Sequence, residues 1–422
     1  MRRHIQLYWS NEYVQGGVFL TVASFIANAL SYVFNFFAAR VLGPAGYGEL
    51  TAFYSYIALF SVPMAVFSHI IIQRISSRAE NPYAYASSFA TQFKHILFCL
   101  LPFIGLSLLG IPFISRITNL SPVVSYLLIP AILLGLISSF YTSLYQGLKL
   151  FFLFSLLSVA GVVLKLVSIV IPVLKYGGLN EVLIFQFIVS TFLVFISFMI
   201  LSKLLRGFSS KQVSSSFIKL QRLLTGHQFI ITLFSVLSFT MLSNVDIMFV
   251  KKFFSSGETG IYSSWSLFAK IILYVVAPLT QISFVFFASN SKKHLQDQVL
   301  LITLGVLALV GVGGYAGYTY LGTFFISSLF GNAFMEVVPY LGLAAIFGMF
   351  YAAISFLNTY FLAKKSRYAL ILAILLPFYL IILFFLPKTL VYLMWTNIVF
   401  AALVASSYLG AFLATRYQNP KP

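Results

Sequence analysis

The sequence contains few charged residues for its length. Of its 422 residues, 8% are Asp, Glu, Lys or Arg, whereas 60% are hydrophobic. A water-soluble domain carries about 25% charged and about 45–50% apolar residues, because its surface must be solvated. The shortage of charge therefore excludes a soluble protein and predicts an integral membrane protein.

The chain also has little of what enzyme active sites and metal centres require. Its single cysteine, Cys99, cannot form an internal disulfide, and its five histidines show no metal-ligand spacing. Most of its eight carboxylates fall in tails, loops or span ends, namely Glu12, Glu80, Glu181, Asp297 and Glu336. Paired acid and base carboxylates are therefore not expected. We predict that the protein is not an enzyme and binds no metal or other cofactor.

Acidic residues are scarcer than basic ones, with 8 Asp and Glu against 26 Lys and Arg and a formal net charge of +18. In a soluble protein this imbalance would suggest a nucleic-acid partner. In a membrane protein it is typical of basic loops retained on the cytoplasmic side. We therefore expect contact with membrane lipid and no contact with nucleic acid.

Long apolar runs make up most of the chain. About 20 apolar residues are needed for a helix to cross roughly 30 Å of hydrocarbon. We predict twelve such spans, at about 16–39, 50–73, 89–114, 122–146, 150–174, 180–205, 224–250, 260–287, 299–320, 338–362, 368–386 and 390–414. With the N-terminus inside, the inner segments hold 17 Lys and Arg and the outer segments hold 6. This bias predicts a multi-pass protein of the cell (inner or plasma) membrane with both termini cytoplasmic.

The longest polar stretch, Lys203–Arg222, lies at the middle of the chain. Its apolar residues recur at helical spacing opposite basic residues, which predicts an amphipathic helix on the inner leaflet, with a solvated loop as the alternative. The stretch divides the chain into an N-terminal six-helix bundle (1–205), a cytoplasmic linker (206–223) and a C-terminal six-helix bundle (224–422).

Two short segments half a chain apart are alike. Arg40–Gly48 reads RVLGPAGYG and Lys252–Gly260 reads KFFSSGETG, at an offset of 212 residues. In each, a cation precedes a short Gly, Pro or Ser turn, and a glycine opens the next span. A repeat with the same membrane orientation implies two bundles related by an axis along the membrane normal.

These segments carry a family resemblance. Arg40–Gly48 resembles the first-loop pattern of Wzx-type polysaccharide-export flippases, members of the multidrug/oligosaccharidyl-lipid/polysaccharide (MOP) exporter superfamily. Asn244-Val-Asp246, the pair Lys251-Lys252, the segment 259–263 and Lys270 resemble that family's seventh-to-eighth span region. The specific residues cover mainly 36–50 and 240–290. The resemblance implies an all-α polytopic membrane protein with about twelve transmembrane helices, in two six-helix bundles (MATE/MOP-like) around a central cavity that opens alternately to either side.

The resemblance also implies a function. Family members move undecaprenyl-diphosphate-linked oligosaccharide repeat units across the cytoplasmic membrane for assembly of O-antigen, capsule or exopolysaccharide. The implied partners are the lipid-linked anionic oligosaccharide, a polysaccharide polymerase and chain-length machinery. A drug or metabolite exporter of the same superfamily is the nearest alternative, although a cavity for cationic drugs would favour carboxylates. A membrane polymerase or ligase would need a sizeable polar outer loop, and the longest outer gap, at about 321–337, offers Glu336 alone among charged or histidine side chains.

Charges inside the spans are the most informative residues, because a bare charge at mid-bilayer costs about 2.5–3.5 kcal/mol on insertion scales. Lys165 lies about 22 Å from the inner end of the fifth span, and Lys270 lies about 15 Å from the outer end of the eighth. The two depths nearly coincide, with one cation from each half. We predict that both line a cationic cavity suited to a diphosphate or an acidic sugar, with snorkelling or a structural ion pair as the alternative.

Asp246 lies near the outer end of the seventh span, and Arg40 ends the first, which is the matching span of the other half. The two residues could pair and lock the outer gate. Alternatively, Asp246 could bind a coupling ion, either a proton or sodium. We predict the gate pair.

Two further patterns concern packing. Gly313 and Gly317 have the small-xxx-small spacing that lets helices approach closely, and they lack the context of a nucleotide-binding loop. Trp265, Tyr392 and Trp395 lie near predicted outer ends, where an aromatic belt is expected.

Overall fold

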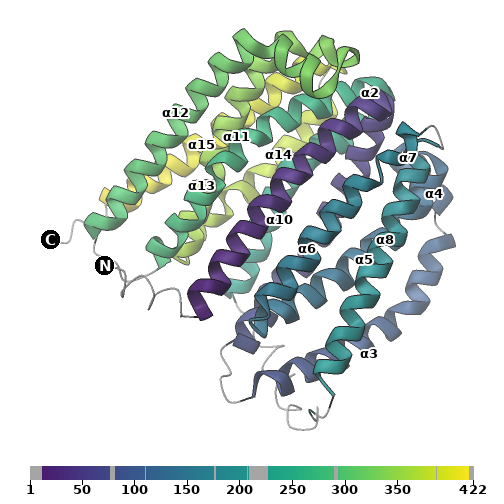
Figure 1. Cartoon of the computed structure of the whole chain (residues 1–422). Coiled ribbons are helices and arrows are strands. Elements are labelled where there is room, and N and C mark those ends of the chain that lie inside the picture. The colour runs from purple at the N-terminus through teal and green to yellow at the C-terminus, as the bar shows by residue number, and fades with distance from the viewer. Residues whose placement is uncertain are drawn as a thin grey trace, which may run out of the picture. The chain divides into compact units, whose positions relative to one another are not determined.

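The computed structural model describes residues 12–76, 81–109, 111–174, 177–206, 208, 227–288, 293–385 and 387–417. These ranges are almost entirely helical and contain no strand (Figure 1). Within these ranges, ten helices are long and apolar enough to cross a membrane. One of them, Phe25–Ser76, covers the first two predicted spans, and α3 covers the third, so the prediction of about twelve spanning helices is confirmed.

The first half of the chain forms seven labelled helices. They are α2 (Glu12–Ser76), α3 (Pro82–Leu109), α4 (Ile111–Thr118), α5 (Pro122–Gly147), α6 (Phe151–Val167), α7 (Val170–Val173) and α8 (Leu179–Leu204). Helix α2 is two helices joined at a kink, because Gly43 has φ +66° and ψ 179°. A left-handed φ favours glycine, and the following Pro44 is tolerated in the first turn of the next helix.

The described residues of the second half form six α-helices and three short helical turns. The long ones are α10 (His227–Phe253), α11 (Ser256–Ala288), α12 (Lys293–Phe325), α13 (Leu341–Ala363) and α15 (Leu390–Tyr417), and α14 (Ile371–Phe385) lies between the last two. A π-helical turn (Ile326–Phe330) and two 3₁₀ helices (Asn332–Tyr340 and Arg367–Leu370) connect them.

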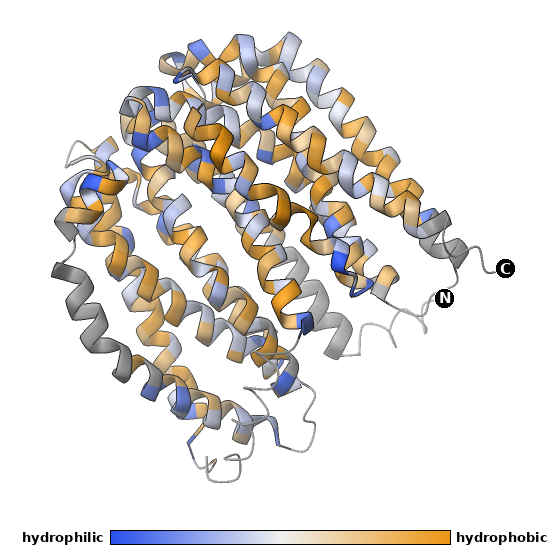
Figure 2. Cartoon of the chain, turned by 180° about the vertical axis from the view of Figure 1, so that it is seen from behind, coloured by the Kyte–Doolittle hydropathy of each residue, from blue (hydrophilic) through white to orange (hydrophobic). Residues whose placement is uncertain are grey.

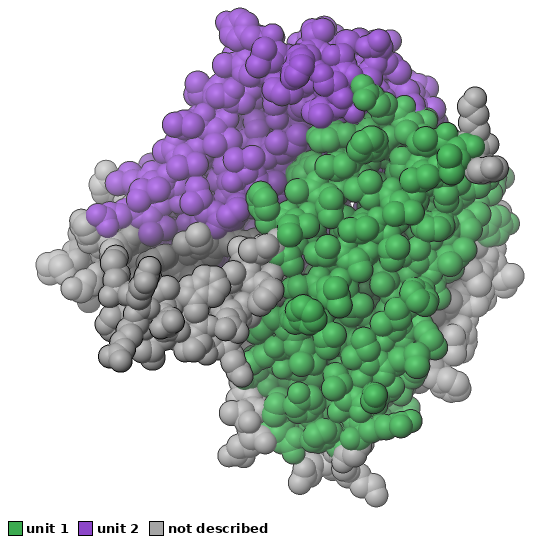
Figure 3. Space-filling model, in the orientation of Figure 1, with its two compact units in different colours: residues 1–42, 56–224 green, residues 43–55, 225–422 purple. Residues whose placement is uncertain are grey.

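The helices form two compact units (Figure 3). Unit 1 comprises residues 1–42 and 56–224, and unit 2 comprises residues 43–55 and 225–422. Segment 43–55 therefore packs with the second half of the chain although unit 1 flanks it on both sides. The linker helix predicted at 206–223 lies outside the described residues, apart from Arg206 and Phe208.

Hydrophobic residues occur along the whole length of most described helices (Figure 2). Many large ones are exposed, such as Phe192 and Phe195 of α8 and Phe378 and Ile381 of α14, each with more than half of its surface accessible. Lipid is the solvent that favours such a surface, since a soluble protein would bury these side chains. Together with the ten apolar helices, this surface indicates a multi-pass membrane protein.

Packing inside unit 2 corrects two expectations. Trp265 is not in an aromatic belt: it is fully buried, its ring stacks on Phe347, and its Nε1 donates a hydrogen bond to the Tyr340 carbonyl. Tyr392 and Trp395 are exposed, as a belt requires. Gly313 and Gly317 have no neighbour where a Cβ would lie, whereas Gly311 and Gly314 lie against Met349 and Ile272. The close helix approach therefore uses the other face of α12.

Candidate functional site

A buried chain of polar side chains crosses the interior of unit 2. Tyr379 of α14 donates a hydrogen bond to Asn397 Oδ1 of α15 over 2.6 Å. The Asn397 amide donates to the Tyr262 hydroxyl oxygen of α11, and the Tyr262 hydroxyl donates over 2.6 Å to Asp246 Oδ2 of α10. Every donor points toward Asp246, which is the acceptor at the end of this chain. Oδ2 of Asp246 can accept this hydrogen bond whether the carboxyl group is ionised or carries a proton on its other oxygen.

Asp246 is buried, and its second oxygen, Oδ1, accepts no hydrogen bond from any described residue. The positive charge that interacts electrostatically with Asp246 is that of Lys270 in α11. A buried carboxylate is costly unless it is paired and hydrogen-bonded. Here Tyr262 supplies one hydrogen bond and Lys270 supplies the opposite charge, and Oδ1 is buried without a hydrogen-bond partner among the described residues.

Local sequence fixes the start of α11, and with it the positions of Tyr262 and Lys270. Ser255 and Glu258 form a capping box: the Ser255 hydroxyl accepts from the Glu258 amide over 3.2 Å, and Glu258 Oε2 accepts from the Ser255 amide over 2.9 Å. Lys251, near the end of α10, donates to the Ser256 hydroxyl over 3.0 Å. Its amino group also lies 4.0 Å from Glu49 Oε2.

The two repeat segments meet inside unit 2. A Cβ on Gly48 would lie 2.5 Å from the backbone N of Gly260 and 2.7 Å from the carbonyl O of Ser256. A Cβ on Gly260 would in turn lie 1.9 Å from the carbonyl O of Pro44. Positions 48 and 260 correspond under the 212-residue offset, as do 44 and 256. The contact is therefore reciprocal, and it requires glycine on both sides.

One helical turn beyond the two glycines, two hydroxyl residues that are also 212 positions apart meet in the same way. Thr51 Oγ1 and Ser263 Oγ lie 2.7 Å apart and share a hydrogen bond. Tyr47, which is fully buried, packs edge-on against Phe330 and Phe334. Backbone contact, hydroxyl pair and aromatic contacts together hold segment 43–55 against α11 and the π-helical and 3₁₀ turns.

Lys165 belongs to unit 1, near the end of α6. It is half-buried, and its Nζ lies 4.4 Å from the centroid of the buried Phe34 ring of α2. A cation over an aromatic face gains up to about 2 kcal/mol when desolvated. The ring therefore stabilises a positive charge inside the apolar part of the bundle.

The predicted site residues fall in both units. Unit 2 brings together Asp246 and Lys270, whereas Lys165 and the exposed Arg40 belong to unit 1. The Arg40–Asp246 gate pair and the shared cavity of Lys165 and Lys270 remain predictions. No group of three or more His, Cys, Asp and Glu side chains that could hold a metal occurs in the described part of the chain.

Sequence reasoning missed Tyr262, Tyr379 and Asn397. Asn397 did carry a signal, because an amide inside an apolar run needs a partner. Tyr262 lies in the segment 259–263 that carries the family resemblance, but nothing in the sequence marked its hydrogen bond to Asp246, and Tyr379 is one of 25 tyrosines in the chain.

No family model and no curated protein matches this sequence. Solved structures do match its fold. The lipid II flippase MurJ in an inward closed conformation aligns with TM-score 0.71 and 17% identity over 94% of this chain and 87% of its own. An inward-facing multidrug resistance MATE transporter of the MOP superfamily aligns with TM-score 0.68 and 15% identity over 96% of this chain and 98% of its own. A MATE protein in complex with MaL6 aligns with TM-score 0.62 and 14% identity over 96% of this chain and 95% of its own.

At these identities the likeness establishes the fold alone. Its full-length coverage agrees with the expected MATE/MOP-like arrangement. The chain is an all-helical, multi-pass membrane protein with the fold that the MurJ lipid II flippase and the MATE transporters share.

Proposed function

We propose that the protein is a flippase that moves undecaprenyl-diphosphate-linked oligosaccharide repeat units across the cytoplasmic membrane for surface polysaccharide assembly. Both termini and the linker at 206–223 lie on the cytoplasmic side in this proposal. The shared fold supports a transporter. The resemblance of Arg40–Gly48 to polysaccharide-export flippases supports the substrate class, which is O-antigen, capsule or exopolysaccharide precursor.

The observation that carries the proposal is a lysine within an apolar helix of each unit. Each unit holds a half-buried lysine inside an apolar helix, Lys165 in unit 1 and Lys270 in unit 2. A diphosphate is a dense anion that forms strong charge-assisted hydrogen bonds with such groups. A neutral or cationic cargo would gain nothing from them.

Alternating access requires contacts that form in one state and break in the other. The reciprocal contact of Gly48 and Gly260, with the Thr51–Ser263 hydroxyl pair beside it, is suited to this role. The contact is small, it involves no ion pair, and it connects segment 43–55 to α11. We assign it to the outer gate, together with the proposed pair of Arg40 and Asp246.

Export of cationic drugs is the second candidate function, and the buried carboxylate of Asp246 favours it. Lys270 opposes it, because its positive charge interacts with that carboxylate and would repel a cationic drug. A proton or sodium ion at Asp246 would couple either kind of transport to a gradient.

Deletion of the protein in its own host distinguishes the two candidate functions. A flippase deletion should accumulate diphosphate-linked repeat units on the inner leaflet and lose surface polysaccharide, with drug resistance unchanged. Loss of drug resistance with normal surface polysaccharide would support the exporter instead.

A further inference from the structure

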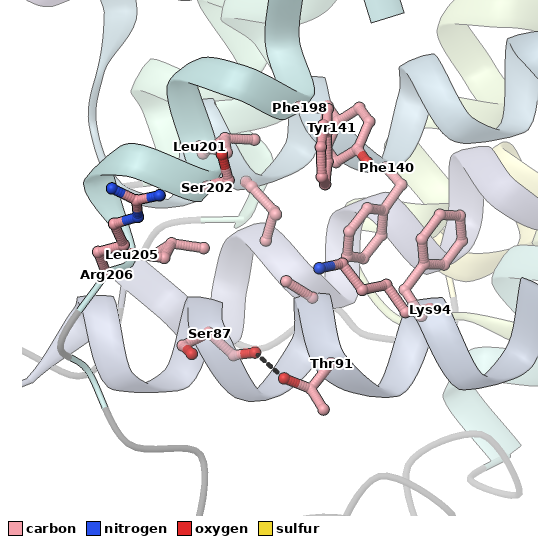
Figure 4. A pocket seen from close by; sticks show the side chains of 13 residues that line it. Ser87, Thr91, Lys94, Phe140, Tyr141, Phe198, Leu201, Ser202, Leu205 and Arg206 are labelled. Atoms are coloured by element: carbon pink, nitrogen blue, oxygen red, sulfur yellow. Dashed lines mark hydrogen bonds between the residues drawn. The ribbon is translucent and has the colours of Figure 1, made fainter. Parts of the chain in front are cut away.

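A pocket of about 220 Å³ lies within unit 1, among α3, α5 and α8 (Figure 4). Its polar side chains are Ser87, Thr91 and Lys94 of α3, Tyr141 of α5, Ser202 of α8 and Arg206 directly after α8. None of the lining residues is acidic. The pocket is separate from the buried polar chain of unit 2 and from Lys165, so the proposed function does not use it.

The two cations of the pocket are Lys94 and Arg206, and neither has a carboxylate partner among the described residues. In Figure 4 the Lys94 amino group lies among the lining side chains, and the Arg206 guanidinium lies at the α8 end of the group. The Lys94 Nζ lies 5.2 Å from the centroid of the Phe198 ring. Across the described ranges, no carboxylate lies within ion-pair distance of either Lys94 or Arg206. Two cations without a carboxylate partner among the described residues, with hydroxyl groups beside them, suit an anionic ligand.

The remaining walls are apolar. Phe140 stacks on Phe93 with ring centroids 3.8 Å apart, and Leu144 and Leu201 are buried behind the pocket. The apolar wall continues onto the outer face of α8, where Phe195 and Met199 are each 54% exposed. A ligand with an anionic head and apolar chains matches this combination, because its head meets the cations while its chains follow α8 into the lipid.

Size decides which anionic amphiphile fits. The pocket is smaller than the roughly 300–1,000 Å³ typical of small-molecule sites. It has room for a single phosphate with its glycerol, but not for a diphosphate that carries an oligosaccharide. The pocket also lies at the end of unit 1 that holds Arg206, the end predicted to face the cytoplasm, where anionic lipids are attracted to basic groups.

We propose that this pocket binds the phosphate headgroup of an anionic diacyl phospholipid of the inner leaflet. Lys94 and Arg206 contact the phosphate, and the hydroxyls of Ser87, Thr91 and Ser202 surround the glycerol. The bound lipid places a negative charge beside Lys94, which is exposed and lies near the start of the span predicted at 89–114.

Native mass spectrometry of the purified, delipidated full-length chain tests the proposal. The protein is supplied with dioleoylphosphatidylglycerol or with zwitterionic dioleoylphosphatidylcholine. We expect one phosphatidylglycerol per chain to be retained about tenfold more tightly than phosphatidylcholine. Lys94→Gln and Arg206→Gln should each weaken that binding about tenfold, since each removes one charge-assisted contact.

Two further variants control for general charge and for misfolding. Lys203 lies at the same end of α8 but does not line the pocket. The Lys203→Gln variant should therefore bind phosphatidylglycerol like the original chain. Ala90→Leu keeps both cations but fills the pocket, and it should lose the bound lipid while eluting as a folded protein.

Four results would overturn the proposal. They are equal retention of both phospholipids, unchanged binding in the Lys94→Gln and Arg206→Gln variants, full displacement of the lipid by millimolar inorganic phosphate, and preferential retention of undecaprenyl diphosphate. The third would indicate a free-phosphate site, and the fourth would indicate a substrate site. The third result would leave the proposed flippase function unaffected, because Lys165 and Lys270 lie outside this pocket. The fourth would support a flippase but would place its substrate here and not beside those two lysines.

Discussion

The hydroxyl oxygens of Thr51 and Ser263 lie 2.7 Å apart, although 212 residues separate them along the chain. The same interval separates the two repeat segments in the sequence. Corresponding residues of the repeat therefore meet each other, first as glycines at 48 and 260 and then as hydroxyls at 51 and 263. We have proposed this contact between equivalent residues as part of the outer gate.

A disulfide at this position should stop transport. In a Cys99→Ser background, oxidation of Thr51→Cys with Ser263→Cys should cross-link segment 43–55 to α11, because the two side chains already touch. We expect oxidised protein to lose transport and a reductant to restore it, measured on reconstituted protein. Full activity of the cross-linked form would show that this contact does not open during the cycle.

Alanine at position 260 should displace segment 43–55. Its Cβ would lie 1.9 Å from the Pro44 carbonyl oxygen, and overpacking of this kind costs about 1–3 kcal/mol. Gly260→Ala should therefore lower the thermal unfolding temperature and the yield of the 51–263 cross-link. Gly257→Ala is the matched control, since no atom lies within 4 Å of its Cβ. Equal behaviour of the two variants would contradict the reciprocal contact.

Removal of the two buried tyrosine hydroxyls should have unequal effects. Tyr262→Phe leaves both Asp246 Oδ2 and the Asn397 amide without partners, whereas Tyr379→Phe affects Asn397 Oδ1 alone. An unsatisfied buried polar group costs about 1–3 kcal/mol. We expect thermal unfolding to rank Tyr262→Phe as the less stable variant, with the exposed Tyr392→Phe unchanged. The reverse order would mean that the hydrogen bonds do not run toward Asp246.

Much of the fold was predictable from sequence, because apolar runs of about 20 residues have few alternatives to a spanning helix. The span predicted at 180–205 is α8 at Leu179–Leu204, and that at 260–287 lies within α11. Asp246 and Lys270 stood out as charges in apolar runs. The interaction between Asp246 and Lys270, and the hydrogen bonds through Tyr262, could not be predicted. They depend on which faces of α10, α11, α14 and α15 meet. Nor does any local pattern place segment 43–55 in unit 2.

Asp246 and Lys270 should be energetically coupled. Either Asp246→Asn or Lys270→Gln leaves the other charge buried without its opposite, which destabilises the unit. The double variant should be less destabilised than the sum of the two, with a coupling energy of about 0.5–3 kcal/mol in a thermal-unfolding cycle. Additive effects would show that Lys270 does not stabilise the carboxylate.

The same Asp246→Asn variant separates the gate from ion coupling. If Arg40 and Asp246 lock the gate, Arg40→Gln should impair transport to a similar extent, and the double variant should be no worse than either single one. If Asp246 binds a coupling ion, Asp246→Asn should abolish the response to an imposed pH or Na⁺ gradient, whatever residue occupies position 40. We expect the gate result.

The central claim is that the protein flips an anionic lipid-linked oligosaccharide by means of a cation from each unit, and transport by the reconstituted chain tests it most directly. In liposomes loaded with undecaprenyl-diphosphate-linked oligosaccharide, a membrane-impermeant oxidant reports how much glycan reaches the outer leaflet. We expect the original chain and the Lys203→Ala control to flip the lipid. Lys165→Ala and Lys270→Ala should each slow flipping about tenfold or more, and Lys→Arg should be milder because it keeps the charge. Flipping at the original rate by the Lys165→Ala, Lys270→Ala double variant, in protein that elutes as folded, would contradict the account.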